Sequence, residues 1–282
     1  MITNPYSGAR VAFATMHGKE RLARESFRDI LGAEVVAVPD LDTDQFGAFS
    51  GEIARTLSPR AAASAKARLG MQLAGTPYGL ASEGSFDAGL GFVTEHHEVL
   101  IFIDETLGLE LVEGAIVASP LPPGRTITST DEGLGYANAV GFPEQGVLVR
   151  GGEAGKLIRK NVESADSLSD ALNELLGKSL NARGGPVTIS PDYRSHRCPS
   201  RAKVIAGLAD TMARRLATPC PQCHICGFGH VDVERGLRCA DCGQPTRVIA
   251  AEIDGCGACS HTVRNPRPDQ RASPQWCDFC NP

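Results

Sequence analysis

The cysteines of this sequence offer its clearest chemistry. Two residues between cysteines allow a tight turn to point both thiolates at one ion, and four thiolates make the tetrahedral site that zinc prefers. Eight of the ten cysteines fall into four such Cys-x2-Cys pairs, namely Cys220/Cys223, Cys239/Cys242, Cys256/Cys259 and Cys277/Cys280. We therefore expect two structural Zn²⁺ ions, each with four protein ligands and no open position for catalysis.

The spacing of the pairs predicts which of them share an ion. The three segments between pairs hold 15, 13 and 17 residues. Joining neighbouring pairs closes only short loops, so we expect the first pair to bind with the second and the third with the fourth, as a tandem zinc ribbon. Interleaved pairing, first with third and second with fourth, is the alternative. Gly243 follows Cys242 and suits the positive φ of such a turn.

Other ligands and other chemistry remain open at this stage. Cys226 lies three residues after Cys223, so these two could form the first turn, and His224 and His230 are further candidates. Iron can also occupy a four-thiolate site. Redox-active pairs usually occur singly, and disulfides are uncommon without export, so both are weaker interpretations. Cys198 is interpreted as a small structural residue, with a reactive thiol as the alternative.

A second candidate site lies near the start of the chain. Residues 15–19 follow a predicted strand and precede a predicted helix, where ligands gather in open α/β sheets. His17, Gly18 and Lys19, with the amide groups of the helix N-terminus, predict a binding site for an anion such as phosphate. A plain turn with solvated side chains is the alternative.

Carboxylates follow two other predicted strands. Asp42, Asp44 and Glu52 lie in one loop, and Glu83 lies with Ser85 in another. Oxygen ligands of this kind suit Mg²⁺ bound together with substrate phosphate. We interpret the four acidic residues as catalytic ligands of a metal-assisted phosphate site and Ser85 as a ligand-binding residue. A solvated acidic loop is the alternative.

Four further basic residues have less defined roles. Lys66 lies on an alanine-rich helix and faces either the phosphate site or water. Arg194, His196 and Arg201 precede or begin the last predicted helix. We interpret them as a solvated basic turn, although they could also grip a carboxylate or phosphate.

Hydrophobic patterning predicts the elements that must position these residues. A strand over 10–16, a helix over 20–31 and a strand over 35–38 indicate a parallel α/β start. Further helices are expected over 59–74, from 129, over 167–176 and over 199–216, with strands over 78–82, 99–103, 109–117, 147–149, 157–158 and 187–189. We expect an α/β domain over 1–216, with a mixed, mainly parallel sheet flanked by helices, and a double zinc-ribbon domain over 217–282.

Composition limits the classes of partner. Hydrophobic residues make up 42% and charged residues 22%, with a net charge of −5, as in a globular protein. We see no signal peptide and no apolar run of membrane-spanning length, so we expect a cytoplasmic protein. Residues 217–282 contain six arginines and seven acidic residues. Nonspecific DNA binding is therefore disfavoured, whereas a protein or RNA contact stays possible.

Several segments resemble a bacterial family catalogued as domain of unknown function 6671, over essentially the whole chain. The segments are 14–20 (ATMHGKE), 42–52 (DTDQFGAFSGE), 81–86 (ASEGSF), 141–144 (GFPE), 267–269 (RPD) and 276–282 (WCDFCNP). The resemblance implies no assigned activity. This sequence departs from the family after Phe86, where Asp-Ala-Gly stands in place of a Gly-Pro-His segment, and Cys198 and Cys226 are peculiar to it.

A fainter resemblance is to the house-cleaning nucleoside triphosphate pyrophosphatases. Ala14-Thr15, Lys19, the alanine-rich helix around 63–67 and Glu83 follow the order of their motifs, with the spacing near Lys19 off by one residue. Our leading hypothesis is binding, or Mg²⁺-dependent hydrolysis, of a small phosphorylated, nucleotide-like ligand by the α/β domain. The competing hypothesis is a non-enzymatic adaptor whose zinc ribbons bind a protein or RNA.

Overall fold

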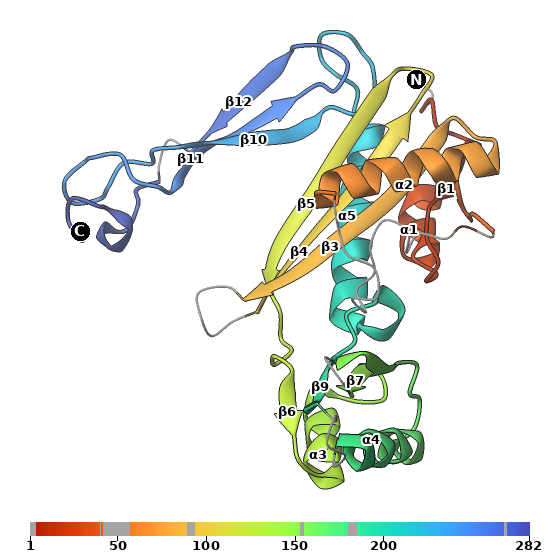
Figure 1. Cartoon of the computed structure of the whole chain (residues 1–282). Helices are drawn as coiled ribbons and strands as arrows, with labels where there is room; N and C mark the ends of the chain where they lie inside the picture. The colour runs from red at the N-terminus through yellow and green to blue at the C-terminus, as the bar shows by residue number, and fades with distance from the viewer. Residues whose placement is uncertain are drawn as a thin grey trace.

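The structure, a computed structural model, describes residues 4–39, 41, 57–88, 94–152, 155–179, 185–267 and 270–282. These residues form three β-sheets with helices packed on two of them (Figure 1). No helix among the described residues is both long enough and apolar enough to cross a membrane.

The first sheet is mixed and has the strand order β2-β1-β3-β4-β5. Its strands are β1 (Arg10–Phe13), β2 (Glu34–Ala37), β3 (Tyr78–Ala88), β4 (Thr94–Asp104) and β5 (Leu109–Ala118). β1 runs parallel to both β2 and β3, whereas β3, β4 and β5 pair antiparallel. The expectation of a mixed sheet is confirmed, but a mainly parallel one is wrong. The connections of the β3–β4–β5 meander are too short for the crossover that parallel neighbours need.

Alternating residues cover both faces of this sheet. Val11 and Phe13 face the helices α1 (Glu20–Ser26) and α5 (Pro199–Ala217), whereas Ala12 and Ala14 face α2 (Pro59–Ala74). A five-residue π-helical turn, Phe27–Leu31, continues α1. Small residues allow α2 to approach closely, since a Cβ added at Gly70 would lie 3.0 Å from the Ala14 Cβ. The sheet is therefore buried between two helical layers (Figure 1).

The second sheet has its own hydrophobic core. Its strands, in the order β6-β9-β7-β8, are all antiparallel: β6 (Arg125–Ile127), β7 (Val147–Gly151), β8 (Leu157–Arg159) and β9 (Val187–Pro191). Helices α3 (Thr130–Val140) and α4 (Ala165–Ser179) pack on it. The sequence did not predict β6, which has only three residues. The chain then returns through the 3₁₀ turn Ser195–Arg197 to α5 on the first sheet.

The third sheet is an antiparallel meander of β10 (Gly229–Arg235), β11 (Ile249–Gly255) and β12 (Thr262–Pro266). It extends away from the first sheet (Figure 1). Arg215 on α5 attaches its base, donating to the Gly227 carbonyl at 3.1 Å and to the Val112 carbonyl at 3.2 Å. The same side chain pairs with Glu113 on β5 at 2.8 Å. Few side chains of the meander are buried, so it has little apolar core of its own.

Candidate metal centres and a buried ionic cluster

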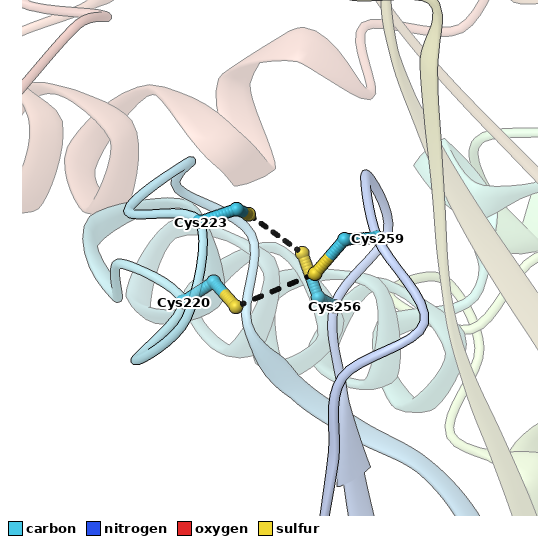
Figure 2. Close-up of side chains that lie close together, drawn as sticks. All are labelled: Cys220, Cys223, Cys256 and Cys259. Carbon is cyan, nitrogen blue, oxygen red and sulfur yellow. Dashed lines mark hydrogen bonds between the residues drawn. The ribbon is translucent and has the colours of Figure 1, made fainter.

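The proximal cysteine group lies where the meander meets the first sheet. It consists of Cys220, Cys223, Cys256 and Cys259. The Sγ atoms of Cys220 and Cys259 are 3.8 Å apart, and those of Cys223 and Cys256 are 3.6 Å apart. Figure 2 shows two separate turns of the chain that point their sulfurs toward each other.

The distal cysteine group lies at the other end of the meander. It consists of Cys239, Cys242, Cys277 and Cys280. The Sγ atoms of Cys239 and Cys280 are 3.9 Å apart, and those of Cys242 and Cys277 are 3.5 Å apart.

These sulfur separations fit a metal ion with four thiolate ligands. A tetrahedron with a metal–sulfur bond of about 2.3 Å has an edge of about 3.8 Å. The observed separations, 3.5 to 3.9 Å, match that edge. Disulfide sulfurs lie about 2.05 Å apart, and all ten cysteines are free. Each group could thus hold one metal ion.

The two groups are interleaved, so the expected sequential pairing is wrong. The first pair joins the third and the second joins the fourth. The reason is that each segment between pairs contains one strand of the meander rather than a hairpin. Successive pairs therefore lie at alternating ends of the antiparallel sheet, and only pairs two apart meet. Two ribbons in tandem are not what these residues form.

The same local turn occurs in the first three cysteine pairs. The amide of the first cysteine donates to the carbonyl five residues on: Cys220 to Ile225, Cys239 to Gln244 and Cys256 to His261. Gly243 has a φ of 72°, as its place after Cys242 predicted. His224 takes the equivalent place after Cys223 with a φ of 62°.

The alternative ligands are not part of either group. His224 is exposed at the turn, and the sulfur set contains Cys220 and Cys223 rather than Cys226. Cys226 is buried in the core of the first sheet beside Leu109 and Leu111, and burial raises the pKa of its thiol. Cys198 is fully buried as well, which supports its interpretation as a structural residue.

A buried ionic cluster lies on the first sheet near the carboxyl end of β1. The Lys66 ammonium pairs with Glu83, and both side chains are more than nine-tenths buried. The Lys19 Nζ donates to the carbonyl and to the hydroxyl of Ser82, each at 3.0 Å. Three layers of the fold thus contribute to it, because Lys66 comes from α2, Glu83 from β3 and Lys19 from the N-terminus of α1.

The cluster continues through a second ion pair. Arg201 on α5 donates through Nε to Glu98 on β4 at 2.8 Å and through Nη2 at 3.1 Å. His96 bonds the same carboxylate at 2.9 Å. Arg201 and Glu98 are each 1% exposed. Aromatic rings pack beside them, since Phe86 stacks on both His96 and Tyr193.

Burial and neighbouring charges change the pKa values in this region. Burial, reinforced by the Arg201 charge, lowers the pKa of Lys19 to about 8. Burial alone would raise the pKa of Glu98, but Arg201 and the His96 hydrogen bond outweigh it and hold that pKa well below its usual range. Burial and the adjacent His196 lower the pKa of His17 to about 4. Burial is thus the main cause of the lowered pKa values of Lys19 and His17, and neighbouring positive charges add to it.

The structure brings together only some of the residues expected at the phosphate site. Lys19 and Glu83 lie in one cluster, with Lys66 facing it rather than water. The Ser85 hydroxyl donates to the Asp87 carboxylate at 2.9 Å. The ring of His17 lies against that of His196 in a tilted contact, with ring centroids 4.5 Å apart. Asp42, Asp44 and Glu52 lie outside the described residues.

The sequence predicted that backbone amides at the N-terminus of α1 would bind an anion, but two of them are used within the chain. The amides of His17 and Lys19 donate to the Thr15 hydroxyl, at 3.0 and 3.4 Å. α1 itself has only seven residues, and Gly18 takes a φ of 69° in the turn. The side chain of Lys19 is thus a stronger feature of this site than the helix N-terminus.

The interpretation of residues 194–201 as a solvated basic turn is wrong. Arg194 is 8% exposed and pairs with Asp192 at 2.6 Å, and Arg201 is buried against Glu98. Glu98 was not among the predicted site residues, although the sequence carries a signal for it. Glu98 shares its strand face with Leu100 and Phe102, both in the core, so alternation places this carboxylate inside.

A comparison with protein families matches residues 66–282 to the domain of unknown function DUF6671. The chain belongs to this family. The match supports the resemblance over most of the chain, although residues 1–65 lie outside it, and it gives no support to the resemblance to nucleoside triphosphate pyrophosphatases. No curated protein matches the chain.

Proposed function

We propose that this member of the family binds two structural zinc ions, one in each cysteine group. The observation that carries the proposal is the sulfur geometry: two sulfur–sulfur separations in each group fit the edge of a tetrahedron, and all four sulfurs of a group lie within 4.8 Å of one another. Thiolate donors favour zinc over magnesium or calcium. Because the meander has little core, metal binding would supply much of its folding free energy.

Elemental analysis of the purified full-length chain tests the zinc proposal. We expect two zinc equivalents, and one equivalent in Cys259→Ser or in Cys280→Ser. Cys226→Ala is the matched control, because that thiol belongs to neither group, and it should keep both. Iron with its thiolate absorption, or less than one metal equivalent in total, contradicts the proposal.

We also propose that the α/β part binds a small phosphorylated, nucleotide-like ligand at the ionic cluster. Lys66 pairs there with Glu83 and Arg201 pairs with Glu98, whereas Lys19 donates to the carbonyl and the hydroxyl of Ser82. A phosphate would relieve the repulsion that contributes to the lowered pKa of Lys19. An adjacent cavity of about 380 Å³ is lined by His17, Gly18, Arg21, Ser195 and His196, among others.

The hydrolytic form of this proposal adds Mg²⁺. Glu83, with Asp42, Asp44 and Glu52 as the sequence suggests, would hold the ion against the phosphate, and the ion would polarise the phosphoryl oxygen. Lys19 would then stabilise charge on the phosphate through its ammonium group.

Thermal-shift assays with ATP, GTP and inorganic phosphate, each with and without Mg²⁺, test both forms. Ligand binding should raise the melting temperature of the native chain and should do so much less in Lys19→Ala. Lys203→Ala removes an exposed lysine on α5 and is the control. If no phosphorylated compound shifts the native chain, the site is not a phosphate site; phosphate release that requires Mg²⁺ would support hydrolysis.

A further inference from the structure

A groove lies beside the distal cysteine group, at the tip of the meander. It has a volume of about 560 Å³, within the range of ligand-binding clefts. Trp276 forms part of its lining together with Arg235, Arg247 and Arg267. No part of the ionic cluster contributes to it, so it is independent of the phosphate site proposed above.

Trp276 presents an unusually exposed aromatic surface in this groove. Its side chain is 60% exposed, although it is the only tryptophan of the chain. It ends the 3₁₀ turn Pro274–Trp276 and directly precedes Cys277, a member of the distal group. The ring has no aromatic or cationic partner within the described part of the chain. A rigidly placed, open aromatic face suits stacking by a planar ligand.

The charge around Trp276 favours an anionic ligand. Three arginines line the groove against one aspartate, Asp278. Arg247 pairs with Asp278 at 3.0 Å, and Arg267 pairs with Glu252 at 2.6 Å. Arg235 donates to the Arg247 carbonyl and has no carboxylate within ion-pair distance among the described residues, so it is the arginine most available to an anion. All six basic residues of 217–282 are arginines. Guanidinium groups bind phosphate in two-pronged geometry and stack on bases, which lysine does not.

We propose that this groove binds single-stranded RNA, with one base stacked on Trp276 and the backbone phosphates held by Arg235 and Arg267. Open aromatic faces between arginines are the usual means of binding single strands. The near-neutral charge of the whole tail does not favour the continuous phosphate contacts of a duplex.

The groove also carries groups suited to ribose. Gln275 and Asp278 line it, and both are exposed. A carboxylate repels phosphate but accepts a hydrogen bond from a 2′-hydroxyl, which DNA lacks. The arrangement therefore favours RNA over DNA of the same sequence. A protein partner is the other class of occupant, and the experiment distinguishes it.

The single tryptophan allows a direct test. The full-length, zinc-loaded chain is titrated with a uridine oligomer of about ten nucleotides, followed by Trp276 fluorescence and by anisotropy of labelled RNA. We expect quenching of the tryptophan and a dissociation constant that rises with salt. Trp276→Ala should weaken binding by about 5- to 150-fold, the loss of one stacked base.

Two matched controls separate the groove from general surface effects. Phe279→Ala removes a nearby aromatic side chain that is 75% exposed but does not line the groove. Arg264→Ala removes an arginine paired with Glu234, as Arg267 is paired with Glu252, but outside the groove. We expect weaker binding in Arg267→Ala and little change in both controls, with two metal equivalents in every variant.

Several results would overturn the proposal. If the uridine oligomer does not bind even at protein concentrations of about 10⁻⁴ M, where nonspecific binding already occurs, the groove is not an RNA site. Equal loss in Trp276→Ala and Phe279→Ala excludes the groove as its location. Equal affinity for a deoxyuridine oligomer of the same length, titrated in the same way, excludes the ribose contacts. Capture of one protein by the native chain but not by Trp276→Ala, without RNA binding, would assign the groove to that protein.

Discussion

Glu98 and Arg201 carry full charges inside the protein. Their Nε–Oε2 distance is 2.8 Å, and Arg201 also donates to the Tyr193 carbonyl at 2.9 Å. Removing two ions from water costs several kcal/mol each, and good geometry with further hydrogen bonds is needed to offset it. Such a pair contributes little net stability while intact, but leaving one member alone is costly.

The variant Glu98→Gln tests this asymmetry. It leaves the Arg201 charge buried without its carboxylate, and we expect the free energy of unfolding to fall by about 3 to 5 kcal/mol. Glu234→Gln interrupts a pair whose side chains are about half exposed, and it should cost at most about 1 kcal/mol. Urea unfolding of both variants at neutral pH measures the difference; equal losses would contradict a buried pair.

The same pair predicts a pH dependence. Because the pKa of Glu98 is lowered in the folded state, its stabilising contribution is present above the ordinary value of 4.5 and is lost as the pH falls below it. The stability difference between the native chain and Glu98→Gln should therefore shrink in acid. Urea midpoints of the two proteins, compared at pH 7 and at about pH 4, measure this. Acid also protonates the cysteine thiolates, but this affects both proteins alike and largely cancels in the difference between their midpoints.

Sequence reasoning at this scale succeeded where the chemistry is local. Cys220 and Cys223 are recognisable because two intervening residues suffice to bring their sulfurs together. Glu98 and Arg201 lie 103 residues apart, so their contact depends on how α5 returns to β4. No local pattern contains that information, although strand alternation does place Glu98 inside.

The three strands of the meander show how an element determines a site. The cysteine turns were predictable, and Gly243 has the expected conformation. Which pairs share a group was not predictable from loop length alone. A strand in each intervening segment carries the next pair to the other end of the meander. β10 and β11 each run the whole length of the meander. Cys223 and Cys239 therefore lie at opposite ends of it. Recognising one strand per segment would have predicted the interleaved arrangement.

Helix α3 begins with a reciprocal cap that can be tested. The Ser129 hydroxyl accepts from the Glu132 amide at 3.2 Å, and the Glu132 carboxylate accepts from the Thr128 amide at 2.7 Å. We expect Ser129→Ala to lower the free energy of unfolding by about 1 kcal/mol. Ser129→Thr retains the acceptor and should lose much less. Urea unfolding decides; equal losses would show that the cap is not the cause.

At the scale of the whole molecule, Arg215 joins three parts of the chain. It bonds the loop before β10, the backbone of β5 and the Glu113 carboxylate. Gly257, inside the third cysteine pair, packs so closely on β5 that an added Cβ would lie 2.5 Å from Leu109. The proximal cysteine group is thus fixed to the first sheet from two sides.

Replacing Arg215 should loosen this attachment. In Arg215→Ala the buried Glu113 loses its partner, and we expect a loss of about 3 to 5 kcal/mol in unfolding free energy. Amide exchange in β10 should accelerate while two metal equivalents are retained. Arg214→Ala, whose side chain is 69% exposed and pairs with Asp210, should change neither. Hydrogen exchange followed by mass spectrometry measures both; unchanged exchange in Arg215→Ala would contradict the role of this side chain.

The organisation of residues 1–216 was only partly predictable. Most helices and strands follow local periodicity, so their approximate positions could be found from sequence. The separate core around Leu168 and Leu172 could not, because it is completed by β6 and β9, which are more than 50 residues apart. Whether 217 is a domain boundary remains a prediction.

The alternation of the cysteine pairs has a consequence for biosynthesis. A growing chain completes Cys239 and Cys242 before Cys256 exists, so the first two Cys-x2-Cys pairs available belong to different groups in the folded chain. A metal ion captured by those two pairs together would have to be exchanged as the meander forms and places them at opposite ends. Metal delivered after the whole meander has formed would avoid this exchange.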